Sequence, residues 1–283
     1  MVRHRNNTLL RLQGFRVLIS RFYWKTTQLW LCAALIVSMC LSPTTQAQQV
    51  SVAVAANFAG SIKQLKPAFE EETGHRLVTS LASSGTFYAQ IYNGAPFDVF
   101  LSADNKRPLQ LVADGLAIED SVFTYALGRL TLWSSNPESI DAQGKFLRAE
   151  GWDKKGIKRI ALANPKTAPY GAAAMEVLAA LNFTDSMKTN LVTGQNVAQA
   201  FQFIVSGNAQ AGFIAQSQLL ALPENNRGSH WLIPAELHSP IEQSAVLLKK
   251  GQGNDAALAF IDFLKSPKAS AIIKASGYNI PNN

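Results

Sequence analysis

The stretch VSVAVAANFAGSIKQLKPAFEEETG, residues 50–74, changes its hydrophobic period at one point. Val50, Val52 and Val54 alternate with small residues, which predicts a strand. After Asn57 the apolar residues recur at helical spacing, so Asn57 is expected to be the N-cap of a helix. The first backbone N–H groups of such a helix have no partner inside it and suit an anion. This turn of small residues is therefore the first candidate binding element.

The change from strand to helix recurs at several later points. The predicted strand Arg76–Ala82 runs into Ser83-Ser84-Gly85, where Ser84 either caps the next helix or donates its hydroxyl hydrogen to a ligand. Gly85 would allow a bound group to approach the backbone closely.

The first predicted helix contains a proline, Pro67. This residue is expected to kink the helix or to end it early.

Two further turns follow in the second half of the chain. The strand Arg159–Ala163 leads to Pro169 and Tyr170 at the start of a helix, where the phenol either reaches out of the turn or packs on the helix end. The helix that begins at Val197 has Asn196 as its expected N-cap, so the N–H of Val197 is a further candidate donor.

Strands alternate with helices throughout, so the predicted fold class is α/β with mainly parallel sheets flanked by helices. Phe123–Ser134 alternates as one long strand with Gly128 near its middle, which indicates a crossing between two domains. In open α/β sheets, ligands bind at the carboxyl ends of strands, where such turns meet. Uncharged donors and helix ends around a cleft predict a receptor for a desolvated oxyanion.

The charge of the chain is concentrated at its beginning. The formal net charge is +7, but six of the 26 Lys and Arg residues lie before residue 48, which leaves 20 against 19 acidic residues. No nucleic-acid surface is therefore expected. Both cysteines, Cys32 and Cys40, also lie in this part, so the remainder is predicted to have neither a disulfide nor a thiol nucleophile.

Residues 1–47 have the pattern of a cleaved signal peptide. Basic residues precede the apolar run Leu29–Leu41, and the small-residue end Thr45-Gln46-Ala47 follows it. The run is short for a transmembrane helix, although an uncleaved anchor is the alternative. Export from the cytoplasm is therefore expected.

Sequence patterns of common enzyme sites are missing. The chain has no Walker sequence, no GxGxxG after a strand and no GxSxG. A hydrolase or lyase with Ser84 as nucleophile would lack a base in any matching turn. Asp98 and Asp104 are interpreted as structural, with Asp104 as the N-cap of a helix, so neither an enzyme nor a directly bound metal ion is predicted.

Several segments together resemble the periplasmic molybdate-binding proteins of ABC transporters, which belong to the type II periplasmic solute-binding proteins. The matching segments are VAVAANF (52–58), SLASSGT (80–86), GAPFDVFLSAD (94–104), ALANPKTAPYG (161–171) and AFIDFLKSP (259–267). The resemblance covers nearly the whole chain from Val50 onward. It implies a fold of two lobes joined by a hinge, and the lobes close around a bound anion.

The resemblance also implies which residues bind the anion. Asn57, with the N–H of Ala56 or of Asn57 beside it, aligns with the first-turn ligand, and Ser84 aligns with the second-turn serine. Tyr170 and the N–H of Val197 occupy the corresponding positions of the later turns. Ala215 stands where other members place a ligand tyrosine, and we infer that the phenol of Tyr170 replaces it.

The implied domains are a signal peptide at 1–47, lobe I at 48–126 plus 240–283, and lobe II at 127–239. The implied cargo is molybdate, with tungstate as a second ion, delivered to an ABC transporter membrane permease by a monomer without a cofactor. The alternative is the same fold with another ligand such as sulfate, phosphate or ferric ion.

Overall fold

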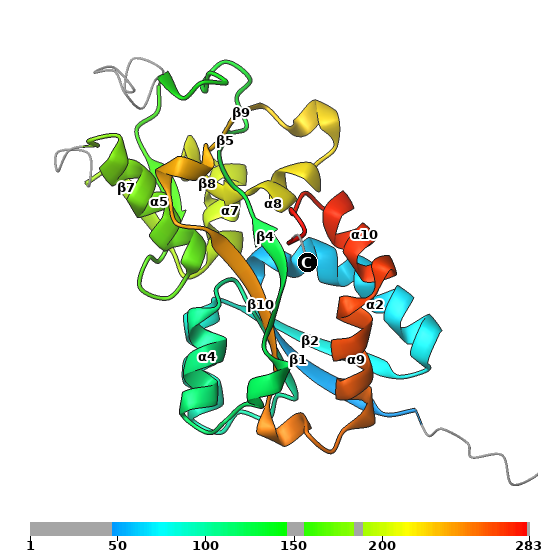
Figure 1. The fold of residues 1–283 in the computed structure, drawn as a ribbon. Helices are drawn as coiled ribbons and strands as arrows, with labels where there is room; N and C mark the ends of the chain where they lie inside the picture. The colour runs from blue at the N-terminus through cyan, green and yellow to red at the C-terminus, as the bar shows by residue number, and fades with distance from the viewer. Residues whose placement is uncertain (1–46, 146–155, 184–188, 282–283) are drawn as a thin grey trace, which may run out of the picture. The chain divides into compact units, whose positions relative to one another are not determined.

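The computed structural model describes residues 47–145, 156–183 and 189–281. The predicted signal peptide lies outside these residues except for Ala47. Ala47–Asn283 forms one compact unit that contains two five-stranded sheets (Figure 1). Within the described ranges, no helix is long and apolar enough to cross a membrane.

The first sheet has the strand order β2-β1-β3-β10-β4. Both β2 and β3 pair with β1 in parallel, whereas β10 runs antiparallel to β3 and to β4. Its strands are β1 (Gln49–Ala55), β2 (Arg76–Ala82), β3 (Val99–Ser102), β4 (Phe123–Gly128) and β10 (Ile241–Leu247).

The second sheet repeats this plan with the order β7-β6-β8-β5-β9. Here β6 is parallel to β7 and β8, and β5 is antiparallel to β8 and β9. Its strands are β5 (Leu130–Ser134), β6 (Ile160–Ala163), β7 (Leu191–Gly194), β8 (Ala211–Ala215) and β9 (Ser229–Leu232). Each sheet is therefore parallel through three strands and antiparallel beyond them, which makes both sheets mixed rather than mainly parallel.

Helices follow the strands as the alternating pattern predicts. In Figure 1, α2, α9 and α10 lie beside one another next to the first sheet, and their mutual contacts agree with this view. The α-helices are α2 (Ala59–Thr73), α3 (Ser84–Tyr92), α4 (Lys106–Ala113), α5 (Pro169–Ala180), α7 (Val197–Val205), α8 (Gln216–Leu220), α9 (Asp255–Lys265) and α10 (Pro267–Ala275). The 3₁₀ turns are η1 (Ala56–Phe58), η2 (Glu119–Ser121), η5 (Glu224–Asn226), η6 (Ala235–Leu237) and η7 (Lys249–Gly251).

Strand β1 shows why the first sheet is covered on both faces. Val50, Val52 and Val54 belong to the apolar cluster that includes residues of α2 and α9. Ala53 points the other way, into the cluster formed with α3 and α4. Successive strand residues face opposite sides of a sheet, so this alternation is the one that the valines predicted. Burial on both faces fixes the strand, and with it the turn at its end.

The start of the first helix differs from the prediction in two ways. Asn57 does not cap it, because Asn57 lies inside η1 and the N-cap of α2 is Phe58. Helix α2 also continues through Pro67 to Thr73 instead of ending early. Leu65 and Phe69 on either side of the proline are fully buried, and their packing offsets the hydrogen bond that proline cannot make.

Other caps can be compared directly. Asn196 caps α7, because its side chain accepts a hydrogen bond from the N–H of Gln199, and this prediction is confirmed. Helix α3 is capped by Ser83 rather than Ser84. Helix α4 has Asn105 as its N-cap, one residue after Asp104, although the Asp104 carboxylate accepts from the N–H of Arg107 at 3.0 Å.

The long predicted strand is divided between the two sheets. β4 ends at Gly128 in the first sheet and β5 begins at Leu130 in the second, so the chain crosses between sheets at Arg129. It returns to the first sheet through β10 (Figure 1). The residue limits given above for the two lobes stay a prediction.

Candidate functional site

A small cavity lies where the helix starts of the two sheets meet. Its volume is about 10 Å³, whereas pockets for organic ligands measure several hundred Å³. None of its lining residues carries a charged side chain, and all five residues predicted to bind an anion are among them. The lining residues are Ala55, Ala56, Asn57, Ser83, Ser84, Ala103, Ala168, Pro169, Tyr170, Asn196 and Val197.

The backbone of α3 directs one free N–H group to this cavity. The N–H of Thr86 donates to the hydroxyl of Ser83, and the N–H of Gly85 donates to the carbonyl of Thr167 at 2.8 Å. The first N–H groups of a helix have no partner within it. Among the described residues of this turn, Ser84 is therefore the one whose backbone N–H is left for a ligand.

The first N–H groups of the two helices beside the second sheet can be assigned to partners in the same way. In α5, Pro169 has no N–H and the N–H of Gly171 donates to Ala168, which leaves the N–H of Tyr170. In α7, Asn196 takes the N–H of Gln199, and Val197 is the first helical residue. These free N–H groups lie at the positive ends of helix dipoles, so the cavity favours an anion.

The hydroxyl of Ser84 is oriented by the backbone. Its Oγ accepts a hydrogen bond from the N–H of Ala103 at 2.9 Å, and the side chain is fully buried. An oxygen that already accepts this bond keeps its own hydrogen for donation. Because both Ser84 and Ala103 line the cavity, a ligand oxygen there is the natural acceptor.

The phenol of Tyr170 is a buried donor without a partner. Its Oη makes no hydrogen bond to any described residue, although Tyr278 and Asn57 lie close to it. A Cβ atom on Gly128 would stand 2.3 Å from this oxygen, so the glycine of the crossing is needed to make room for the phenol. An unpaired buried hydroxyl costs roughly 1–3 kcal/mol, which is a reason to expect a ligand beside it.

Asn57 has a different arrangement from the one expected. Its Nδ2 donates to Gln243 Oε1 at 2.6 Å and to Tyr278 Oη at 3.0 Å. The Nε2 of Gln243 donates to the carbonyl of Ile241 at 3.2 Å, and this bond fixes which end of the Gln243 amide faces Asn57. Both amide hydrogens of Asn57 are thus used inside the protein. The donors that this turn has left for the cavity are backbone N–H groups of Ala56 and Asn57.

A second set of hydrogen bonds, which we call the rear contact, connects this turn to α8. The Oγ of Ser217 donates to the carbonyl of Asn57 at 3.1 Å and lies 3.1 Å from Tyr278 Oη. Tyr278 Oη also donates to the carbonyl of Asn57 at 2.9 Å. All three residues are buried, so the rear contact is a buried link between the turn after β1 and helix α8, which follows β8 of the second sheet.

The buried phenols lead to a prediction for alkaline pH. Burial raises the pKa of Tyr278 to about 12, partly offset by its hydrogen bonds to Ser217 and Asn57, and burial raises the pKa of Tyr170 and Tyr125 well above 10. Above pH 10 the unfolded chain loses phenolic protons that the folded protein keeps, so the free energy of unfolding falls as the pH rises. Tyr278 alone should contribute a loss of about 3 kcal/mol by the time the pH exceeds its folded pKa.

Urea unfolding at pH 8 and at several values between pH 10 and pH 12 measures this loss. Tyr278→Phe should show a smaller decline than the parent, whereas Tyr92→Phe, at an exposed tyrosine, should match the parent. Equal declines in the parent and in Tyr278→Phe would contradict the stated cause.

Several of these residues carry no signal in the sequence. Gln243, Tyr278 and Ser217 reach Asn57 from 186, 221 and 160 residues away along the chain. No local motif marks them, and only the fold brings them together. Ala215 is fully buried at the end of β8 and does not line the cavity.

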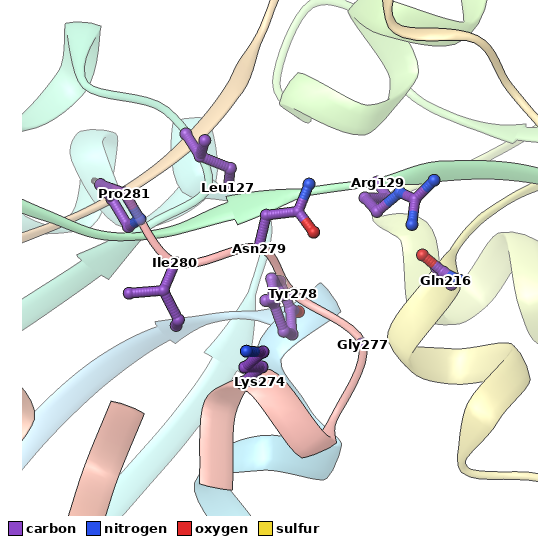
Figure 2. Close-up of a pocket in the computed structure, with 9 residues that line it drawn as sticks. All are labelled: Leu127, Arg129, Gln216, Lys274, Gly277, Tyr278, Asn279, Ile280 and Pro281. Atoms are coloured by element: carbon purple, nitrogen blue, oxygen red, sulfur yellow. The ribbon is translucent and has the colours of Figure 1, made fainter. Parts of the chain in front are cut away.

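A larger pocket of about 740 Å³ lies behind Tyr278, beside the crossing from β4 to β5. Figure 2 shows Arg129 and Gln216 on one side of it and Lys274 on the other, with Asn279 between them. It was not predicted from the sequence, and it shares no lining residue with the small cavity. In the described ranges, no group of three or more His, Cys, Asp or Glu residues is placed to hold a metal ion.

Two mixed sheets that enclose an uncharged cavity between helix starts have the architecture of two-lobed solute-binding proteins. The family described as bacterial extracellular solute-binding protein matches residues 50–279. The molybdate-binding protein ModA of Azotobacter vinelandii is 48% identical over 85% of this chain and 93% of its own length. ModA of Rhodobacter capsulatus is 44% identical over 87% of this chain and 94% of its own length.

A solved structure gives the same result. The periplasmic molybdate-binding protein of Azotobacter vinelandii superimposes with a TM-score of 0.77 and 43% identity, and the match covers 82% of this chain and 100% of that chain. The chain belongs to the bacterial extracellular solute-binding proteins and, within them, to the family of molybdate-binding proteins.

Proposed function

We propose that this protein is a periplasmic receptor that binds molybdate in the small cavity and delivers it to an ABC transporter membrane permease. The observation that carries this proposal is a cavity lined by free helix N–H groups, the Ser84 hydroxyl and an unpaired phenol, without a charged side chain in its lining. The names of its relatives agree with this ligand class. Tungstate, which has the same shape and charge, is proposed as a second cargo.

The proposed ligands are the N–H groups of Ala56 or Asn57, of Ser84, of Tyr170 and of Val197, together with the hydroxyls of Ser84 and Tyr170. Four helix starts supply them, and these come from both sheets. A tetrahedral dianion offers acceptors in all directions, so donors that surround it can pair each oxygen. Pairing matters because a charged acceptor left without a donor in a dry site costs several kcal/mol.

The donor set also bears on the competing ligands. Phosphate keeps a proton near neutral pH, and its O–H group needs an acceptor. The lining offers no carboxylate, so hydrogen phosphate should bind poorly. Sulfate carries no proton and differs from molybdate mainly by its shorter bonds, so it is harder for the protein to exclude than phosphate.

The lining of the cavity also argues against catalysis. It holds no His, Lys or carboxylate that could act as a base for Ser84. Transport is therefore proposed, with molybdate as cargo and no resident cofactor.

Isothermal titration calorimetry on the chain from Gln48 onward tests the function. Molybdate and tungstate should bind tightly at one site, and phosphate should give no measurable heat at the same concentrations. Weak heats of equal size for molybdate, tungstate, sulfate and phosphate would contradict the proposal. Sedimentation of the same sample tests the proposed monomer.

Tyr170→Phe tests whether the phenol donates to the ion. The affinity for molybdate should fall roughly tenfold, because one charge-assisted hydrogen bond is lost. The thermal midpoint of the ligand-free variant should not fall, since the ring keeps its packing and the lost hydroxyl has no protein partner. Unchanged affinity would mean that the phenol only packs.

A further inference from the structure

Two sets of hydrogen bonds join the two halves of the protein beside residues that line the cavity, and they differ in their exposure. The rear contact, formed by Ser217, Asn57 and Tyr278, is buried. On the other side, the N–H of Gly85 donates to the carbonyl of Thr167 at 2.8 Å, and Nη2 of Arg107 donates to the carbonyl of Lys166 at 3.3 Å. We call these two bonds the rim contact. They join α3 and α4, next to the first sheet, to the turn between β6 and α5 in the second.

Arg107 is held in place from its own side of the rim contact. Its Nη1 forms an ion pair with Oδ2 of Asp104, and its N–H donates to Oδ1 of the same carboxylate at 3.0 Å. The carboxylate also accepts from the hydroxyl of Ser102 at 3.1 Å. The side chains of Arg107 and Asp104 are only 17% and 20% exposed, so the guanidinium is fixed in direction rather than free in solvent.

The position of Arg107 sets what it can do. It does not line the cavity, and its charge is paired with Asp104, so it is not a ligand of the ion. Its Nη2 reaches a backbone carbonyl in the turn between β6 and α5, a bond that exists only while the two sheets are together. The partly exposed rim contact should break before the buried rear contact, since exposed hydrogen bonds open at lower free energy.

We propose that Arg107 is a positioning residue that holds the cleft closed over the bound ion, and that release begins at the rim contact while the rear contact stays intact. This inference rests on the proposed function, because the ion is the group that would be retained. It concerns the rate of release and not the chemistry of the ion's ligands.

The test measures release of radioactive molybdate from the protein after a chase with excess unlabelled molybdate. Arg107→Ala should raise the dissociation rate roughly three- to tenfold, with the association rate within about twofold of the parent. Asp104→Asn, which keeps the guanidinium but loosens its support, should give a smaller increase. Arg107→Lys should restore part of the slow release, because an ammonium can still donate to the carbonyl of Lys166.

Lys106→Ala is the matched control, because Lys106 is the exposed neighbour on the same helix. Its dissociation rate should equal that of the parent. An unchanged dissociation rate in Arg107→Ala, or a slower association at an unchanged dissociation rate, would overturn the proposal, since the second outcome indicates electrostatic steering. If the parent binds no molybdate, the proposed function fails instead, so the two failures are distinguishable.

Discussion

Gly85→Ala is expected to weaken molybdate binding by about 2–4 kcal/mol, or roughly 30- to 1,000-fold. A Cβ atom at this position would lie 2.9 Å from both Cα and the carbonyl oxygen of Thr167, in the turn that follows β6 of the second sheet. Backbone atoms cannot move aside as a flexible side chain can, so the sheets must separate. Separation also breaks the bond from the N–H of Gly85 to Thr167. Calorimetry measures the affinity, and small-angle scattering measures whether the liganded variant stays more open.

Gly60→Ala is the control for this substitution. Gly60 lies in α2, and a Cβ atom there would meet nothing within 4 Å. The change should leave affinity unaltered and raise stability slightly, because alanine loses less conformational freedom than glycine in a helix. If Gly85→Ala binds molybdate as tightly as Gly60→Ala, the closed arrangement described here is not the one that binds the ion.

Ser84→Ala is expected to weaken molybdate binding by roughly 1–3 kcal/mol and to lower the stability of the protein as well. The loss of affinity follows from removing a donor to a buried charged oxygen. The loss of stability follows because the N–H of Ala103 loses its acceptor, the Ser84 Oγ, in a fully buried position. Calorimetry and urea unfolding of the ligand-free variant measure the two effects separately.

Ser80→Ala provides the comparison, since Ser80 lies on β2 and is exposed. It removes the same hydroxyl group without touching the cavity, so both measurements should match the parent. A Ser84→Ala protein that is destabilised but binds molybdate normally would show that the hydroxyl supports Ala103 and does not contact the ion.

Much of the fold could be predicted because it depends on local patterns. The alternating valines of β1 mark a strand, and their burial among residues of α2 and α9 is the burial that the alternation requires. Asn196 was recognisable as a cap because its partner, the N–H of Gln199, lies only three residues away. The antiparallel additions, β4 and β10 in one sheet and β5 and β9 in the other, could not be predicted. Strand direction depends on pairing between distant segments, and the hydrophobic period of a segment does not indicate its direction in the sheet.

The candidate site, like the fold, could be predicted only in part. The turns that hold Ala56, Ser84, Tyr170 and Val197 were identified from residue type, and the structure places all of them on one cavity. Their role as ligands is still a prediction. The expectation that Asn57 caps a helix was wrong, because its amide is engaged by Gln243 and Tyr278, which are far away in sequence.

The sequence by itself determined where strands give way to helices, and therefore where unpaired N–H groups occur, because both follow from the periodicity and capping preferences of neighbouring residues. Only the tertiary structure decided which of those groups stay free. The N–H of Gly85 is taken by Thr167 and the Oγ of Ser84 by Ala103, while the phenol of Tyr170 finds no partner beside Gly128. Such outcomes depend on contacts between segments that fold together from distant parts of the chain, and no local pattern encodes them.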